Sequence, residues 1–392
     1  MMERVRLGEL VDFSNGYAFK SSDYVDESNT LNCRMSNIRP DGSFNIRYSA
    51  KYLPDTFVNK YSDYILKDGD LIIAMTDMAG DPKILGIPTV VKTDGYNVLM
   101  NQRVGKLTLK TNAILPEYLK YSLSSKPIRE YFKSFAGGGV QLNIGKKEIL
   151  NTMVSICDIT EQKHIVKILS KITDLISKRK EQLEKLDEIV KARFVELFGD
   201  PEINPKGLKK VMLSDIAEYY NGLTYSPDNV SDTGTIVLRS SNIQNSQLDF
   251  EDTIRVDCSI KEKLYVKDND ILMCSRNGSA RLVGKVALIK NLDEPMSFGA
   301  FMMIIRSNYY PYLMTYFQMD AFRRQISTGA TTTINQITGN MLNKISLPLP
   351  EMSEINQFAT FVEQTDKSKL EVQKSLEKLE VLKKALMQKY FG

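Results

Sequence analysis

The sequence predicts an α+β fold: two tandem mixed α/β domains with pseudo-twofold symmetry, separated by two long antiparallel helices that form a coiled coil. Three observations predict this fold. The chain repeats itself once along its length, its globular parts alternate short apolar runs with turn residues, and its remaining parts space apolar residues by heptads.

The internal repeat follows the order A–B–A′–B′. "LEKLDEIVKARFVELFG" at 183–199 is similar to "LEKLEVLKKALMQKYFG" at 376–392. Further similar pairs keep the same order: 7–16 and 213–222, 34–38 and 239–243, 66–76 and 266–276, 135–151 and 327–343, 158–174 and 351–366. Chance does not keep so many matches collinear, so we divide the chain into 1–157, 158–200, 201–350 and 351–392.

Units A and A′ contain short runs typical of strands, broken by Gly, Asn, Asp and Pro. Strands are predicted at 70–75, 88–92, 103–109, 235–243, 270–275 and 284–290. Each unit then has a longer amphipathic stretch, 115–135 in A and 309–326 in A′, where a helix is expected. These patterns indicate mixed α/β domains.

Units B and B′ show the spacing of coiled-coil helices, in which apolar residues recur every three or four positions. Arg179 and Arg193 interrupt the first seam. "DITEQ" and "EMSEI" resemble helix starts. Because B connects A to A′ and B′ follows A′, two helices that pack together must run antiparallel. The predicted seam comprises Ile165, Leu169, Ile172, Ile176, Leu183, Leu186, Val190, Leu197, Phe358, Val362, Val372, Leu376, Leu379 and Leu386.

Composition places the chain among ordinary globular proteins. It has 392 residues, 42% of them hydrophobic, and a net charge of +4 that permits a polyanionic partner. The four cysteines form no CxxC pair, and the N-terminal stretch lacks the apolar run of a secretory signal. We expect a cytoplasmic protein with reduced thiols and no membrane span.

Motifs for catalysis are scarce. The single histidine, His164, lies within the first long helix, where a surface position is expected. "GGGVQLNIGKK" has the wrong glycine spacing for a phosphate-binding loop. Pro54 with Asp55 and "DPK" at Asp81 would supply a nuclease-like set, but such short patterns arise often by chance. We predict no catalytic residue and no metal site.

Polar loops stand at matching places in both copies. Their Arg, Lys, Asn, Gln, Ser, Thr and Tyr side chains can contact phosphates or base edges, although such loops are often simple turns. Arg34 and Arg239 contact DNA or pin a loop. The candidate DNA-binding residues are Asn15, Tyr17, Lys20, Arg34, Ser36, Asn37, Thr76, Gln102, Arg103, Gly138, Gln141, Asn143, Thr224, Tyr225, Arg239, Ser240, Asn242, Arg276, Asn277, Thr331, Thr332 and Asn335.

The order of these motifs resembles the specificity subunit of type I restriction-modification systems over essentially the whole chain. "GGGVQLNI…ITEQKHIVKIL", "ATTTINQI…LPLPEMSEINQF" and the "LEKL…FG" helix ends carry the resemblance. It implies that 1–157 and 201–350 are target-recognition domains, each reading half of a bipartite double-stranded DNA site. In one departure, the second copy has Ile355 where the first has Gln162.

The resemblance also implies partners. Two methyltransferase subunits would dock on the helices and domains, and restriction subunits would join them. S-adenosylmethionine, ATP and Mg²⁺ are expected on those partners, and no cofactor on this chain. Two alternatives stay open: a self-contained restriction or methylating enzyme, and a coiled-coil scaffold with no role on DNA.

Overall fold

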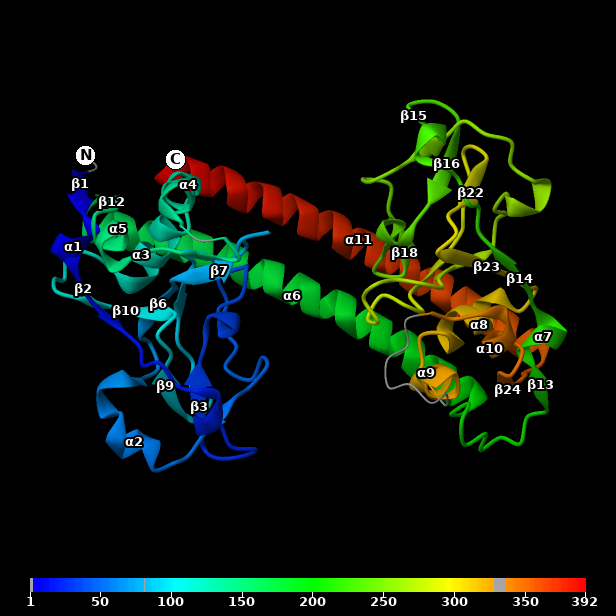
Figure 1. Ribbon diagram of the computed structural model, residues 1–392, viewed down its shortest axis with the longest axis horizontal. Helices are drawn as coiled ribbons and strands as arrows, with labels where there is room; N and C mark the ends of the chain where they lie inside the picture. Colours follow the sequence, from blue (N-terminus) through cyan, green and yellow to red (C-terminus); the bar gives the residue numbers. More distant parts are fainter. Residues whose placement is uncertain (1–2, 81, 138, 328–335) are drawn as a thin grey trace. The chain divides into compact units, whose positions relative to one another are not determined.

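The computed structural model describes residues 3–80, 82–137, 139–327 and 336–392. The chain forms two compact units, unit 1 with Met1–Arg179 and Ser375–Gly392, and unit 2 with Lys180–Lys374 (Figure 1). The division cuts two 40-residue helices, α6 (Ile159–Phe198) and α11 (Met352–Phe391). We call residues 1–157 head 1 and residues 201–350 head 2.

Head 1 contains two four-stranded sheets. The first has the antiparallel order β2 (Val11–Asn15), β10 (Val104–Leu109), β6 (Leu71–Ala74) and β8 (Pro88–Val90). The second has the order β4 (Tyr52–Leu53), β3 (Thr30–Cys33), β9 (Asn97–Met100) and β5 (Ile65–Leu66), in which β3 and β9 are parallel. Because parallel strands end at the same edge, the residues after β3 and β9 lie together.

The remaining elements of head 1 connect these sheets. β1 (Glu3–Arg6) pairs with β12 (Met153–Ile156), and β7 (Thr76–Met78) pairs with β11 (Gln141–Asn143). The helices are α1 (Leu7–Leu10), α2 (Phe57–Lys60), α3 (Pro116–Leu123), α4 (Lys126–Phe135) and α5 (Lys146–Leu150), with 3₁₀ turns η1 (Ser21–Asp23), η2 (Met35–Asn37) and η3 (Ser62–Tyr64).

Head 2 has two four-stranded sheets, of which the first repeats the strand order of head 1 and the second differs from it in one edge strand. The first is β14 (Glu218–Asn221), β23 (Met302–Arg306), β20 (Ile271–Cys274) and β21 (Val286–Leu288). The second is β15 (Val230–Ser231), β19 (Arg255–Val256), β16 (Thr235–Leu238) and β22 (Met296–Phe298), in which β16 and β22 are parallel. The fourth strand is β5, next to β9, in head 1 and β15, next to β19, in head 2, so the sequence repeat is a repeat of strand order for the first sheet and for three strands of the second.

Head 2 has the following further elements. β13 (Lys210–Met212) pairs with β24 (Ser346–Pro348), and β17 (Ile243–Gln244) pairs with β18 (Gln247–Leu248). The helices are α7 (Leu213–Ile216), α8 (Tyr310–Tyr316), α9 (Asp320–Ser327) and α10 (Gly339–Leu342), with 3₁₀ turns η4 (Pro227–Asn229), η5 (Ser240–Asn242) and η6 (Glu262–Leu264).

Three predicted elements differ in extent. The helix expected over 309–326 is divided into α8, which ends at Tyr316, and α9, which begins at Asp320. The helix expected over 115–135 is broken into α3 and α4, because Ser124 and Ser125 close the first helix and Pro127 stands at the start of the second. The strand expected over 235–243 stops at Leu238, where the η5 turn begins after Arg239. Local side-chain hydrogen bonds accompany two of these ends: Ser124 Oγ donates to Lys120 O at the end of α3, and Asn242 Oδ1 accepts from Arg239 N in the η5 turn.

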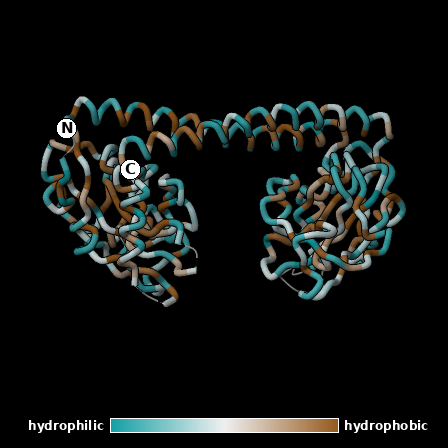
Figure 2. The backbone as a smooth tube through the Cα atoms, turned by 90° about the horizontal axis from the view of Figure 1, so that it is seen from above, coloured by the Kyte–Doolittle hydropathy of each residue, from teal (hydrophilic) through white to brown (hydrophobic). Residues whose placement is uncertain are grey.

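Each head has clusters of buried apolar residues, and hydrophobic segments of the chain run through both heads in Figure 2. In unit 1, Ile165 and Leu169 of α6 belong to the core cluster of head 1, and Leu386 and Phe391 of α11 pack against it. In unit 2, Val190 and Phe194 of α6 and Phe358 of α11 belong to the core of head 2. The predicted seam residues Ile165, Leu169, Val190, Phe358 and Leu386 therefore pack on the heads. The heptad pattern alone did not predict these contacts.

In unit 2 the two long helices run in opposite directions. Lys369 Nζ lies 2.6 Å from Asp187 Oδ1, the Arg193 guanidinium lies 5.8 Å from the centre of the Phe361 ring, and the rings of Phe198 and Phe358 are 5.4 Å apart. As the residue number increases along α6, the number of the residue it contacts on α11 decreases, so the two helices are antiparallel in unit 2.

Every predicted seam residue is buried or partly buried. Those buried are Ile165, Leu169, Ile172, Ile176, Val190, Phe358, Val372 and Leu376. Those partly buried are Leu183, Leu186, Leu197, Val362, Leu379 and Leu386. His164 is exposed on α6, as expected. No helix among the described residues is long and apolar enough to cross a membrane.

The fourth residue of each long helix is fully buried, but it is polar in α6 and apolar in α11. Gln162 and Ile355 are both 0% exposed. The Gln162 side chain accepts a hydrogen bond from Leu115 N (2.9 Å) and donates to Ala113 O and Cys157 O (both 2.8 Å). Ile355 instead packs within the apolar cluster of head 2. Asp158 caps α6 by accepting from Thr160 N and Glu161 N.

We expect Gln162→Ala to lower the free energy of unfolding by about 1–3 kcal/mol, because the variant loses a fully buried side chain and its three hydrogen bonds to the main chain. Urea denaturation measures this loss, and hydrogen exchange should show reduced protection of the Leu115 amide. Lys163→Ala, at the exposed neighbouring position, is the control and should change stability by less than about 0.5 kcal/mol. Equal effects of both variants would contradict the assignment.

Candidate nucleic-acid interface

Head 1 gathers polar loops at the edge where its parallel strands end. β3 ends at Cys33 and β9 at Met100, which are register partners. Arg34 and Asn101 follow these strands, and Asn101 N donates to Cys33 O (2.9 Å). The carboxyl ends of parallel strands therefore begin the candidate interface.

An Asn-Gly loop joins this edge after β2. A Cβ on Gly16 would lie 2.3 Å from the carbonyl oxygens of Met100 and Asn101, so only glycine lets the two main chains approach. Tyr17 N donates to Met100 O (2.8 Å), and Gln102 N donates to Tyr17 O (3.0 Å). These bonds bring the loops of Asn15, Tyr17 and Gln102 together.

A third group extends the same edge through β6, β7 and β11. Met75 N donates to Arg103 O (3.0 Å), and Ile144 N donates to Met75 O (2.9 Å). Thr76 pairs with Asn143, whose side-chain oxygen accepts from Thr76 Oγ1 at 2.7 Å. Residues distant in the sequence thus meet as one set of loops in head 1.

Head 2 repeats this arrangement with other side chains. A Cβ on Gly222 would lie 2.1 Å from Gly299 O, and Leu223 N donates to Phe298 O (2.7 Å). Ser275 N and Arg276 N donate to Phe301 O (2.9 and 3.0 Å). The Arg276 guanidinium lies 5.5 Å from the Phe301 ring centre. Position by position, Arg276 replaces Thr76 and Phe301 replaces Arg103.

The candidate residues differ in accessibility. Exposed are Asn15, Lys20, Gln102, Asn143, Thr224 and Arg276. Partly buried are Tyr17, Arg34, Ser36, Arg103, Gln141, Tyr225, Arg239, Ser240 and Asn277. Buried are Asn37, Thr76 and Asn242. Gly138, Thr331, Thr332 and Asn335 lie outside the described residues.

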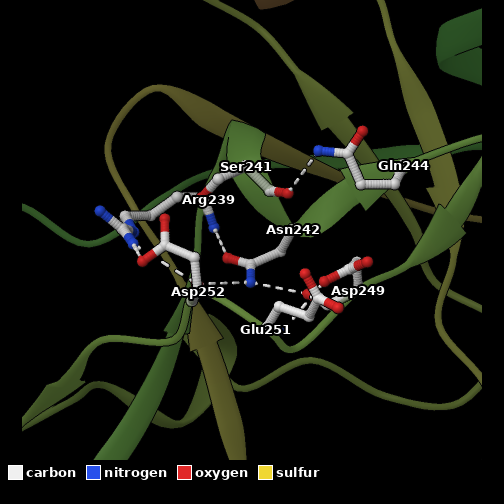
Figure 3. A network of polar contacts seen from close by, with 7 residues as sticks. All are labelled: Arg239, Ser241, Asn242, Gln244, Asp249, Glu251 and Asp252. Atoms are coloured by element: carbon white, nitrogen blue, oxygen red, sulfur yellow. Dashed lines mark hydrogen bonds and ion pairs between the residues drawn. The ribbon is translucent and has the colours of Figure 1, made fainter. Parts of the chain in front are cut away.

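Asn37 and Asn242 have a structural task in place of the predicted one. Each is 1% exposed and accepts, through its side-chain oxygen, from the main chain of the arginine three residues earlier (2.7 and 2.8 Å). Asn37 Nδ2 donates to Asn45 O, and Asn242 Nδ2 donates to Asp249 O and Asp252 O (Figure 3). Buried and engaged amides cannot read bases, so we remove both from the candidate set.

Arg34 and Arg239 pin the loops that these asparagines close. Arg34 Nη2 donates to Ser49 O, and Arg239 Nη2 donates to Asp252 Oδ1 (2.8 Å). Thr76, 3% exposed, is likewise engaged with Asn143. Of the two roles open for these arginines in the sequence, their contacts favour the loop-pinning role.

An aromatic cluster lies next to this edge, and only Tyr17 among its members was predicted from the sequence. Tyr17, Phe19, Phe57, Tyr61 and Tyr64 are all partly exposed. The ring centres of Tyr17 and Tyr61 are 4.5 Å apart, and the hydrogen bond between them raises the pKa of Tyr17. Lys60 Nζ lies 5.2 Å from the Tyr61 ring centre. The spacing of aromatic residues around α2 was the available signal.

The side chains that most often bind metals in proteins are His, Cys, Asp and Glu. No cluster of three or more His, Cys, Asp or Glu side chains able to hold a metal ion occurs in residues 3–80, 82–137, 139–327 and 336–392.

Residues 1–185 and 205–383 each match the family model of the type I restriction modification DNA specificity domain. The MjaVIII specificity subunit of Methanocaldococcus jannaschii is 30% identical over 212 residues, covering 53% of this chain and 47% of that protein. The StySPI specificity subunit of Salmonella potsdam is 27% identical over 196 residues, covering 47% and 42%. The matches thus span about half the length of these relatives.

Solved structures show the same fold. The type I restriction-modification S subunit from M. genitalium matches with a TM-score of 0.57 and 14% identity, covering 100% of this chain and 96% of that one. A chain from a study of assembly and conformational transition of the type I system matches with a TM-score of 0.52, 17% identity and coverage of 100% and 97%. The repeated match of the family model shows that this chain belongs to the family of type I restriction-modification specificity subunits.

Proposed function

We propose that the chain is the sequence-specific DNA-recognition subunit of a type I restriction-modification complex, with each head reading one half of a bipartite site. The main support is that the two heads have loops at equivalent strand ends, held by equivalent main-chain contacts, but with different side chains. A common frame with divergent loops suits two readers of different sequences.

The divergence has chemical content. The position held by Arg103 in head 1 is held by Phe301 in head 2, and the position of Thr76 is held by Arg276. An arginine reads guanine through two hydrogen bonds, whereas an apolar ring contacts the thymine methyl group. The two edges would therefore favour different bases at corresponding places in their half-sites.

The long helices would form an antiparallel coiled coil that relates the heads by a pseudo-twofold axis and sets the spacer between half-sites. The opposite directions of α6 and α11 within unit 2 support this. Exposed apolar side chains on the helices, such as Ile189 at 48% and Val381 at 68%, support docking of two methyltransferase subunits there. Restriction subunits would complete the assembly in the cytoplasm.

We also propose that the chain is non-catalytic and that S-adenosylmethionine, ATP and Mg²⁺ act on the partner subunits. A self-contained enzyme would methylate or cut DNA as the purified chain alone. A scaffold without a role on DNA would show negligible, salt-insensitive DNA affinity even with a methyltransferase subunit present.

Methylome sequencing of the host with and without this gene tests the proposal. We expect deletion to remove methylation from one bipartite motif, and reintroduction of the gene to restore it. An unchanged methylome in a host whose methyltransferase subunits are expressed would contradict the proposal.

A further inference from the structure

Each head holds one loop closed by the same contacts, which we call the clamped loop: Asn45–Ser49 in head 1 and Asp249–Asp252 in head 2. Asn45 N donates to Asn37 O, and Asp249 N donates to Asn242 O, both at 2.9 Å. Arg34 and Arg239 bond to the far ends of these loops. The two loops are therefore held by corresponding contacts, although they differ in sequence and in length, with five residues in head 1 and four in head 2.

A second contact fixes the register within the loops. Arg47 N donates to Asn45 Oδ1 (3.1 Å), and Glu251 N donates to Asp249 Oδ1 (2.8 Å). Each amide bonds to the side chain two residues earlier, so Arg47 and Glu251 occupy the same place. Both side chains are exposed. The equivalent position thus carries opposite charges in the two heads.

The surroundings in head 1 leave the positive charges uncompensated. The Arg39 guanidinium lies 3.6 Å from the Tyr48 ring centre, that of Arg47 lies 5.5 Å from Tyr96, and Lys51 Nζ lies 5.9 Å from Tyr24. None of these three cations forms an ion pair among the described residues. Cations held against aromatic rings keep their attraction for an external anion.

In head 2 the arginines near the clamped loop form ion pairs. Arg239 pairs with Asp252 at 2.8 Å (Figure 3), and Arg255 makes two hydrogen bonds of 2.7 Å to Glu294. The bond from Arg255 lowers the pKa of Glu294, so this pair stays charged and internally balanced. Asp249 and Glu251 add net negative charge to the loop, which repels phosphate.

We propose that the clamped loop of head 1 binds a DNA backbone phosphate through Arg47, and that the clamped loop of head 2 makes no such contact. The inference rests on the proposed function and adds an asymmetry to it: head 1 gains affinity that carries no sequence information. Arg34 supports the contact indirectly, because its side chain holds the loop beside the strand ends of the interface.

The test compares Arg47→Ala with the matched control Glu251→Ala in the full chain, assembled with its methyltransferase subunits. The probe is a duplex that the wild-type complex enriches from a randomised DNA pool. Affinity is measured over a salt series. We expect Arg47→Ala to reduce the slope of log K against log salt by about 0.9, the value for one lost phosphate contact. Glu251→Ala should leave the slope unchanged.

Two further measurements separate the outcomes. Arg47→Lys keeps the charge and should restore the slope, which excludes misfolding as the cause. Arg47→Ala should weaken binding equally across single-base variants of the probe. An unchanged slope, or a changed preference at one base pair, would overturn the phosphate contact while leaving the proposed function intact. Failure to enrich any duplex would instead overturn the proposed function itself.

Discussion

Replacing Phe358 with alanine is expected to lower the free energy of unfolding by about 3–5 kcal/mol, the range for deleting a buried aromatic ring. Phe358 is 0% exposed, and its ring centre lies 5.7 Å from that of Phe194 and 5.4 Å from that of Phe198, both edge-on. The variant loses these contacts and leaves a cavity where α6 and α11 meet the core of head 2. Denaturant unfolding followed by circular dichroism measures the loss.

Val381→Ala is the matched control, because it also shortens an apolar side chain of α11. Val381 is 68% exposed, so this change should alter stability by less than about 0.5 kcal/mol. A Phe358→Ala protein as stable as the control would show that α11 is not anchored in the core of head 2.

Exchanging head 1 for that of another specificity subunit is expected to change one half of the methylated motif completely and leave the other half intact. Each head has its own sheets and its own loop edge, so the bases that one edge contacts depend on that head alone. Methylome sequencing of a host carrying the chimera gives the result directly. Alteration of both halves would contradict modular reading.

The structure refines where such a graft should end. A graft of residues 1–157 leaves the new head on the old Ile165 and Leu169, which lie in the core of head 1. Leu386 and Phe391 of α11 pack against the same core. A second chimera should therefore carry these helix residues from the donor as well. We expect it to recognise the same new half-site but to be more stable.

Local patterns predicted much of the fold because the information is local. The heptads of 159–198 contain no Gly or Pro, and α6 spans that segment. The runs at 70–75 and 270–275 lie between turn residues and became β6 and β20. The repeat strengthened each strand assignment, because an equivalent strand was predicted at the matching place in the other copy.

Burial of polar residues could not be predicted in this way. The sequence predicted that Asn37 and Asn242 contact bases, because they lie in polar loops. In the structure, the side-chain amides of both residues hydrogen-bond to the main chain and close the loops. Gln162 lies at a core position where the repeat has isoleucine, and only the folded chain brings Ala113, Leu115 and Cys157 to its amide. The Gln162 partners Leu115 and Ala113 are 47 and 49 residues away in sequence, and the Asn37 and Asn242 partners are set by the conformation of the loop, which the residue types alone do not state.

The packing of Leu386, Met387 and Phe391 against head 1 has a consequence for biosynthesis. The ring of Phe391 lies 5.1 Å from that of Tyr118, in the core that forms around the first residues of the chain. A ribosome delivers those late residues only after all of head 2 has emerged. The part of the protein that is translated first is therefore the part whose core is completed last, and until then the apolar surface that these residues cover stays exposed.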